Sequence, residues 1–140
     1  RLLGANKAVL SPEELIEDSK QLSDIIPKGI YVYGNIPLMI FKNCPLKNGI
    51  SCKDCDKKGV ITDRLGVEFP IRCRMGYSEL LNSVPLWLAD KKAVVNSFDF
   101  MILYFTRESK ERVGEVITAY KNNTPPDVKH TKGLYFRGTI

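Results

Sequence analysis

Short apolar runs that alternate with helix-type patterns mark both ends of the chain. Residues 7–10 form one such run and are expected to be a short buried strand. Ser11, Pro12 and Glu14 follow with an N-cap, a proline at the first helical position and a capping box. Apolar side chains then recur at helical spacing until Pro27, namely Leu15, Leu22, Ile25 and Ile26. The pattern predicts one β-α unit.

The middle of the chain is typical of strands and turns. Residues 30–33 predict a strand, Gly34 interrupts it, and residues 37–41 form a second apolar stretch. Two further apolar stretches, 60–63 and 67–71, flank a turn that contains a glycine, which predicts a β-hairpin. Residues 78–82 are expected to form a turn or a short helix.

The C-terminal half returns to alternating strands and helices. A short buried strand is expected at 86–89, a helical turn or two at 90–96, and a strand buried on both faces at 98–105. Thr106 is expected to cap a helix whose apolar face is Val113, Val116, Ile117 and Tyr120. The apolar tail at 134–136 is expected to dock onto the core.

Together these elements predict an α/β fold of β-α units with short parallel-type strands, into which a central β-hairpin and a cysteine-rich loop are inserted. We expect residues 1–140 to be a single domain or a fragment of a larger protein. Within it, 42–74 is the cysteine-rich basic insertion and 86–123 is a strand-helix-strand-helix unit. No apolar run is long enough to span a bilayer, and the chain starts without a methionine or a signal pattern. We therefore expect a cytoplasmic fragment that does not interact with membranes.

Four cysteines carry the most specific chemistry, with the spacing Cys44-x7-Cys52-x2-Cys55-x17-Cys73. A Cys-x-x-Cys pair lets two thiolates face one ion across a tight turn, and two more cysteines complete tetrahedral coordination. Sulfur ligands favour zinc or an iron–sulfur cluster over magnesium or calcium. The pattern predicts one shared metal site on the four cysteines. Disulfides, unconnected thiols and a thioredoxin-like redox pair at Cys52 and Cys55 are the alternatives.

The net charge of +5 is concentrated near these cysteines. Between Lys42 and Arg74 there are eight basic and four acidic side chains. The surplus can attract an anionic partner such as RNA. It can also offset metal-bound thiolates, because four of them around a divalent ion leave about two negative charges.

No complete catalytic signature is present in the sequence. The single histidine, His130, lies in a polar tail, and neither a serine triad, a phosphate loop nor a dinucleotide fingerprint is found. Asp63 and Arg64 in the predicted hairpin, and Arg107 and Glu108 after the long strand, are the candidates for a polar site. A turn with a local ion pair and a solvated first helical turn are the structural alternatives. Neither a nucleophile nor a general base can be identified.

Several ordered segments resemble the collagenase-like peptidases of family U-thirty-two. The resemblance runs through nearly the whole chain, at 8–13, 33–39, 43–45, 62–66, 69–71, 79–82 and 133–138. The resemblance lies in the ordered set, which includes the Thr-Asp-Arg-Leu-Gly run at 62–66 and the Phe-Pro-Ile run before Cys73. The chain departs from the family where Gly29 and Tyr33 stand in the places of a glutamate and a histidine.

The resemblance implies a later portion of a longer protein, whose β/α-barrel-like N-terminal region is missing here. It implies a peptidase of unknown catalytic type, with the remainder of the chain as partner and a peptide as substrate. Some relatives hydroxylate RNA bases or a quinone precursor and hold a four-iron four-sulfur cluster on four cysteines. Cys73 is similar in context to the last of those ligands. A purely structural zinc knuckle is the third hypothesis.

Overall fold

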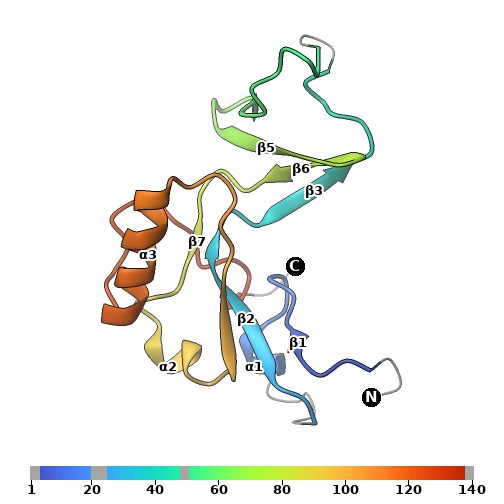
Figure 1. The fold of residues 1–140 in the computed structure, drawn as a ribbon. Coiled ribbons are helices and arrows are strands. Elements are labelled where there is room, and N and C mark those ends of the chain that lie inside the picture. Colours follow the sequence, from blue (N-terminus) through green and yellow to red (C-terminus); the bar gives the residue numbers. More distant parts are fainter. Residues whose placement is uncertain (1–3, 20–24, 48–50, 138–140) are drawn as a thin grey trace. The chain divides into compact units, whose positions relative to one another are not determined.

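The computed structural model describes residues 4–19, 25–47 and 51–137 of the chain (Figure 1). The chain divides into two compact units. Unit 1 combines Arg1–Gly34 with Pro85–Ile140, and unit 2 is Asn35–Val84. All four cysteines belong to unit 2, which includes the expected cysteine-rich insertion together with the strands on either side of it.

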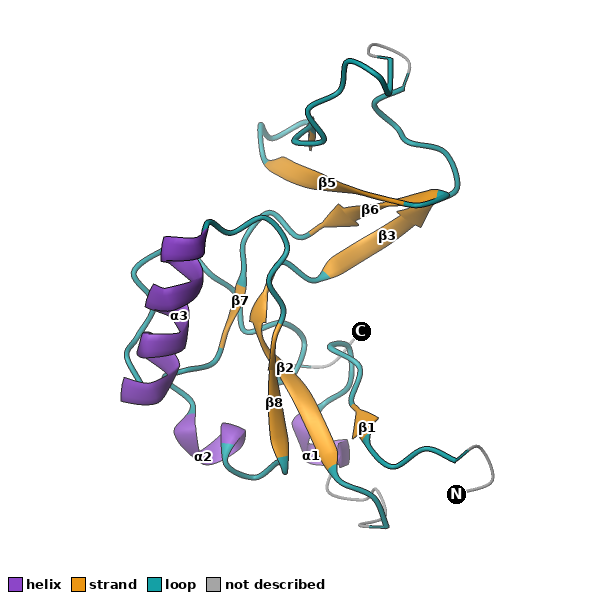
Figure 2. Cartoon of the chain, viewed as in Figure 1, coloured by secondary structure: helices purple, strands orange, loops and turns teal. Residues whose placement is uncertain are grey.

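Unit 1 is built around strand β2 (Lys28–Gly34), whose apolar run was expected to be a strand. Strands β1 (Ala8–Val9) and β8 (Phe100–Leu103) run parallel to β2. Strand β7 (Leu86–Trp87) pairs antiparallel with the last two residues of β2 (Figure 2). This mixture of helices with a largely parallel sheet agrees with the predicted α/β class.

Three helices lie in the described part of unit 1, namely α1 (Ile16–Ser19), α2 (Lys92–Val95) and α3 (Lys110–Asn122). The prediction that Thr106 caps α3 is wrong, because Ser109 is the N-cap and its side chain accepts a hydrogen bond from the Arg112 amide. The Glu108 carboxylate accepts the amides of Thr106 and Arg107 instead. These two hydrogen bonds satisfy backbone donors ahead of the helix and delay its start.

The helix expected after Ser11 is shorter than its pattern indicates. Ser11 Oγ accepts the Glu13 amide in a turn, and α1 begins only at Ile16. Residues 20–24, which include Leu22, lie outside the described residues. Ile25 is 69% exposed, so its expected place on an apolar helix face is wrong.

The core of unit 1 gathers around Trp87. Tyr33, Ala89 and Val116 are buried with it, and four partly buried side chains pack against them: Leu103, Phe105, Ala119 and Tyr120. The Tyr120 hydroxyl donates to the carbonyl of Val32 and accepts the Leu88 amide, so it connects α3 to β2 and to the residue that follows β7. The tail also docks as expected, because Tyr135 is buried and its carbonyl accepts the Ile16 amide.

Strand β8 is less buried than its apolar sequence predicts. Phe100, Ile102 and Leu103 are half-buried, and Met101 is 48% exposed. Within the described residues β8 pairs only with β2, so it is an edge strand in this sheet. The expectation of burial on both faces is therefore wrong.

Gly34 ends β2 in a conformation that requires glycine. Its φ is +124°, and a Cβ placed there would lie 2.1 Å from the Tyr104 carbonyl oxygen. The Tyr104 amide donates to the Tyr33 carbonyl just before it, at 2.8 Å. A side chain at position 34 would break this close approach of two backbones.

Unit 2 contains an antiparallel sheet in the order β3-β6-β5-β4. Its strands are β3 (Pro37–Phe41), β4 (Val60–Thr62), β5 (Glu68–Arg74) and β6 (Tyr77–Leu81). The predicted hairpin is confirmed as β4 and β5. The turn or short helix expected at 78–82 is wrong, because this segment pairs with strands on both sides, which local sequence does not reveal.

Candidate metal centre

The four cysteines come from three places along unit 2. Cys44 lies just after β3, Cys52 and Cys55 lie in the loop between β3 and β4, and Cys73 is in β5. Only the strands can bring the first and last of them together, because 28 residues separate them in the sequence.

Strand pairing brings Cys73 close to the end of β3. Cys73 is opposite Ser78 of β6, and on the other side of β6 the same serine is opposite Phe41. Cys44 follows Phe41 by three residues. The Cys44 and Cys73 side chains share a hydrogen bond.

The Cys52–Cys55 segment is a compact turn. The Ser51 carbonyl accepts the Asp54 amide at 3.0 Å, and Ser51 Oγ accepts the Lys53 amide at 3.3 Å. The Lys57 amide donates to Cys55 Sγ at 3.3 Å, with Lys57 at a positive φ of 61°. This hydrogen bond fixes the Cys55 sulfur against the turn that contains it.

The other three cysteines all affect the pKa of Cys73. Burial raises the pKa of Cys73, and Cys44 raises it further through its charge and the shared hydrogen bond. Cys52 and Cys55 act in the same direction through their charges. Like charges oppose one another's ionisation, whereas a bound cation would reverse this effect and deprotonate thiols.

The four thiols lie in one region but do not form a closed coordination shell. Within the described ranges, no three side chains of the ligand types Cys, His, Asp and Glu are close enough together to hold a metal ion. All four cysteines are described and are free thiols. Cys52 and Cys73 are exposed, so an ion could approach from solvent.

Mild oxidation of the metal-free protein should join Cys44 to Cys73 first. Of the other three thiols, Cys44 affects Cys73 most, through its charge and a side-chain hydrogen bond, and disulfide formation needs one sulfur to attack another directly. Treatment with diamide followed by non-reducing peptide mapping should show this pair ahead of Cys52–Cys55. A Cys52–Cys55 bridge as the first product would contradict the prediction.

The polar candidates of unit 2 have a structural role. Asp63 Oδ1 accepts the amides of Leu65 and Val67 at 2.8 and 2.9 Å, which holds the turn between β4 and β5. Arg64 is exposed in the same turn. Asp63 therefore stabilises this turn through hydrogen bonds from backbone amides.

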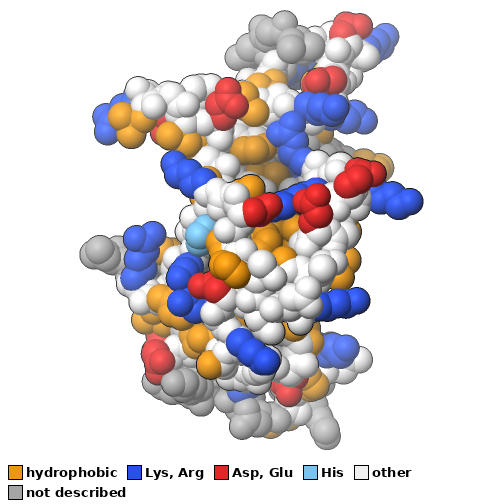
Figure 3. Space-filling view, turned by 90° about the vertical axis from the view of Figure 1, so that its left-hand side faces the viewer, with side chains coloured by type: hydrophobic (Ala, Val, Ile, Leu, Met, Phe, Trp, Pro, Cys, Tyr) orange, Lys and Arg blue, Asp and Glu red, His pale blue; other side chains and the backbone are white. Residues whose placement is uncertain are grey.

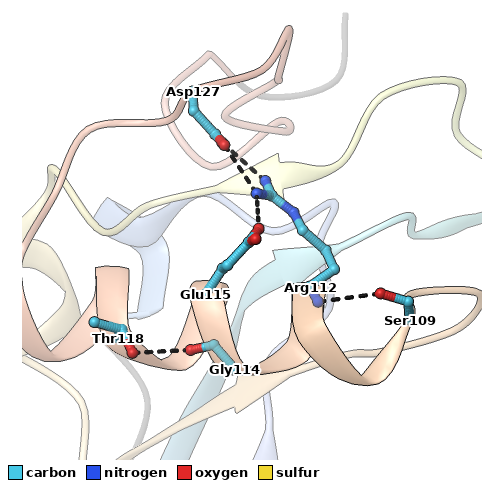
Figure 4. Close-up of polar contacts among 6 residues, drawn as sticks. All are labelled: Ser109, Arg112, Gly114, Glu115, Thr118 and Asp127. Carbon is cyan, nitrogen blue, oxygen red and sulfur yellow. Dashed lines mark hydrogen bonds and ion pairs between the residues drawn. The ribbon is translucent and has the colours of Figure 1, made fainter.

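In unit 1, Glu108 belongs to a polar network at the end of the parallel strands, and Arg107 precedes it as an exposed residue. The pKa of Tyr33 is raised to about 12, first by burial and then by the charge and hydrogen bond of Glu108, while Arg112 opposes the increase. Arg112 donates to both Asp127 oxygens at 2.8 and 2.9 Å and to Glu115 at 2.9 Å (Figure 4).

Sequence reasoning missed most of this network. Tyr33 could have been found because it ends a parallel strand, where α/β folds place functional groups. Arg112 and Asp127 carry no comparable signal, since only the tertiary structure brings the loop after α3 against the helix. The guanidinium of Arg112 also lies 5.9 Å from the centre of the Trp87 ring. The network therefore fastens α3 to the core.

Charge is mixed on the surface. On the face drawn in Figure 3, basic and acidic side chains are interspersed. In the part of the chain that the structure describes, no helix is both long and apolar enough to cross a membrane.

Comparisons with known proteins leave the family open. No protein-family model, no curated protein and no solved structure matches the chain.

Proposed function

We propose that unit 2 is a metal-binding module that holds zinc or a four-iron four-sulfur cluster on Cys44, Cys52, Cys55 and Cys73. The observation that carries the proposal is the convergence of thiols from separate segments. Cys44 raises the pKa of Cys73 through its charge and a side-chain hydrogen bond, and Cys52 and Cys55 raise it through their charges.

The donor set favours a metal over the alternatives. Four sulfur ligands suit zinc and iron–sulfur clusters and are poor ligands for magnesium and calcium. The amide of Lys57 already donates to one sulfur, as outer-shell groups do around bound thiolates. The surplus of basic side chains between Lys42 and Arg74 would offset the negative charge of a four-thiolate site.

The module would serve a longer protein related to the collagenase-like peptidases. In that setting the bound centre supplies stability or redox chemistry, and the groups that attack a peptide come from the remainder of the chain. Free thiols suit a reducing compartment such as the cytoplasm. The alternative is a part of an RNA- or quinone-precursor-hydroxylating relative, which the basic character of 42–74 favours.

Anaerobic purification with metal analysis and an absorption spectrum tests the proposal. A brown protein with iron and sulfide indicates a cluster, and a colourless protein with one zinc per chain indicates a knuckle. Cys73→Ser should lose most of the metal, because removal of a ligand weakens binding more than the roughly 10–100-fold typical of outer-shell changes. Met75→Ser, at an exposed position in the next turn, is the matched control and should keep the metal. If wild-type protein from such a preparation contains no metal and cannot take up zinc or iron, the proposal is refuted.

A further inference from the structure

Strand β8 has the sequence of an interior strand but lies at a sheet edge. Residues 100–105 are all hydrophobic, a pattern typical of a parallel strand that is covered on both faces. In the described residues β8 nevertheless pairs only with β2 (Figure 2), and Met101 is 48% exposed. The sequence thus suits a second neighbouring strand, which the described part of the chain does not supply.

The other edge strands have features that discourage pairing with a further strand. Natural sheet edges are protected by short strands, prolines, lysines or bulges. Strands β1, β4 and β7 have only two or three residues. Strand β3 begins with Pro37, has a register irregularity and ends directly before Lys42. No proline, lysine or other charged residue lies between Phe100 and Phe105, so β8 lacks this protection.

The backbone groups that β8 directs to its free edge follow from the hydrogen bonds of β2. The Gly29 carbonyl accepts the Leu10 amide from β1, so the residues on either side of Gly29 face β8 instead. Phe100, opposite Gly29, therefore directs its backbone groups to β2. Because these directions alternate along a strand, Met101 and Leu103 direct their amides and carbonyls to the free edge.

We propose that β8 is a self-association edge, at which two copies of the chain pair their β8 strands antiparallel about Ile102. Met101 of each copy then lies opposite Leu103 of the other, as two-fold symmetry requires. These are the residues whose backbone groups face the edge, so both pairs form hydrogen bonds. The hydrophobic strand also places no like charges opposite each other. A second copy therefore fits this edge without any change in the strand.

The geometry determines the size and strength of the assembly. Pairing of one edge with its own copy uses up that edge, so association ends at the dimer. Because β8 has only four residues, the interface is small and the dimer depends on protein concentration. The inference goes beyond the proposed function and does not require a metal, since β8 belongs to unit 1 and the cysteines belong to unit 2.

Sedimentation velocity of the full chain, from about 1 μM to about 1 mM, tests the inference. A reducing agent is included, because the free cysteines could otherwise form disulfide-linked dimers. Wild-type protein should change from monomer to dimer over this range. Met101→Lys should weaken the dimer by about tenfold or more, because each dimer would then place two charges at a hydrophobic edge. Hydrogen exchange of the Met101 and Leu103 amides in wild-type protein should slow as the concentration rises.

Two variants serve as controls. Met101→Val keeps a hydrophobic side chain with strand preference at the same position, and Met75→Lys introduces the same charge at a 99% exposed position in unit 2. Both should dimerise like the wild type. A wild-type protein that stays monomeric, or forms species larger than a dimer, would overturn the inference. So would a dimer in which the exchange of Met101 and Leu103 is independent of concentration, a result that holds even if Met101→Lys does not fold.

Discussion

Trp87→Ala is expected to lower the free energy of unfolding of unit 1 by about 3–5 kcal/mol, which is typical of a large aromatic removed from a core. Trp87 is 1% exposed, and its ring lies 5.6 Å from the ring centres of both Tyr33 and Tyr120. Its loss would leave a cavity between β2, β7 and α3, the elements that form this core. Denaturant unfolding followed by far-ultraviolet circular dichroism measures the change.

Trp87→Phe is the matched control for this variant. The Trp87 Nε1 has no hydrogen-bond partner in the described residues, so phenylalanine removes an unpaired donor and keeps most of the apolar volume. We expect it to destabilise far less than alanine. Equal losses for the two variants would mean that the indole N–H has a partner, and the account of this core would have to be revised.

Glu79→Ala is expected to destabilise the sheet of unit 2 by about 3–5 kcal/mol, because removal of one partner of a buried ion pair leaves the other charge uncompensated. Arg72 donates to Glu79 from Nε at 2.6 Å, and Arg74 Nε lies 3.6 Å from the same oxygen. The Arg72 and Glu79 side chains are only 11% and 9% exposed. Hydrogen exchange of amides in β5 and β6 measures the effect.

The double variant Arg72→Met with Glu79→Leu tests whether the loss of stability in Glu79→Ala comes from the uncompensated charge of Arg72. Replacement of both charges by apolar groups of similar size is often neutral or stabilising, so the double variant should recover most of the protection lost in Glu79→Ala. If the double variant exchanges as fast as the single one, then Arg74 or another group depends on Glu79, and the pair cannot be treated alone.

The sequence by itself determined the local elements whose pattern is strong. The strand at 30–33, the hairpin around Gly66 and the short strand at 86–89 follow from apolar runs bounded by turn residues, and all three are present as β2, β4–β5 and β7. These three elements depend on residues that are close together in the sequence, so the pattern of a single sequence is enough to predict them. The shared site that the spacing of the cysteines predicts stays a prediction.

Only the tertiary structure decided the features that depend on distant partners. Residues 78–82 resemble a turn locally and become β6 because strands on both sides supply hydrogen bonds. Ser109 replaces Thr106 as the cap of α3 because a carboxylate takes the amides ahead of it. The effect of Cys44 on the pKa of Cys73, and the burial of Ser78 opposite Cys73, depend on the register of three strands. Strand register is set by packing across the whole sheet, and that is why local sequence alone does not reveal it.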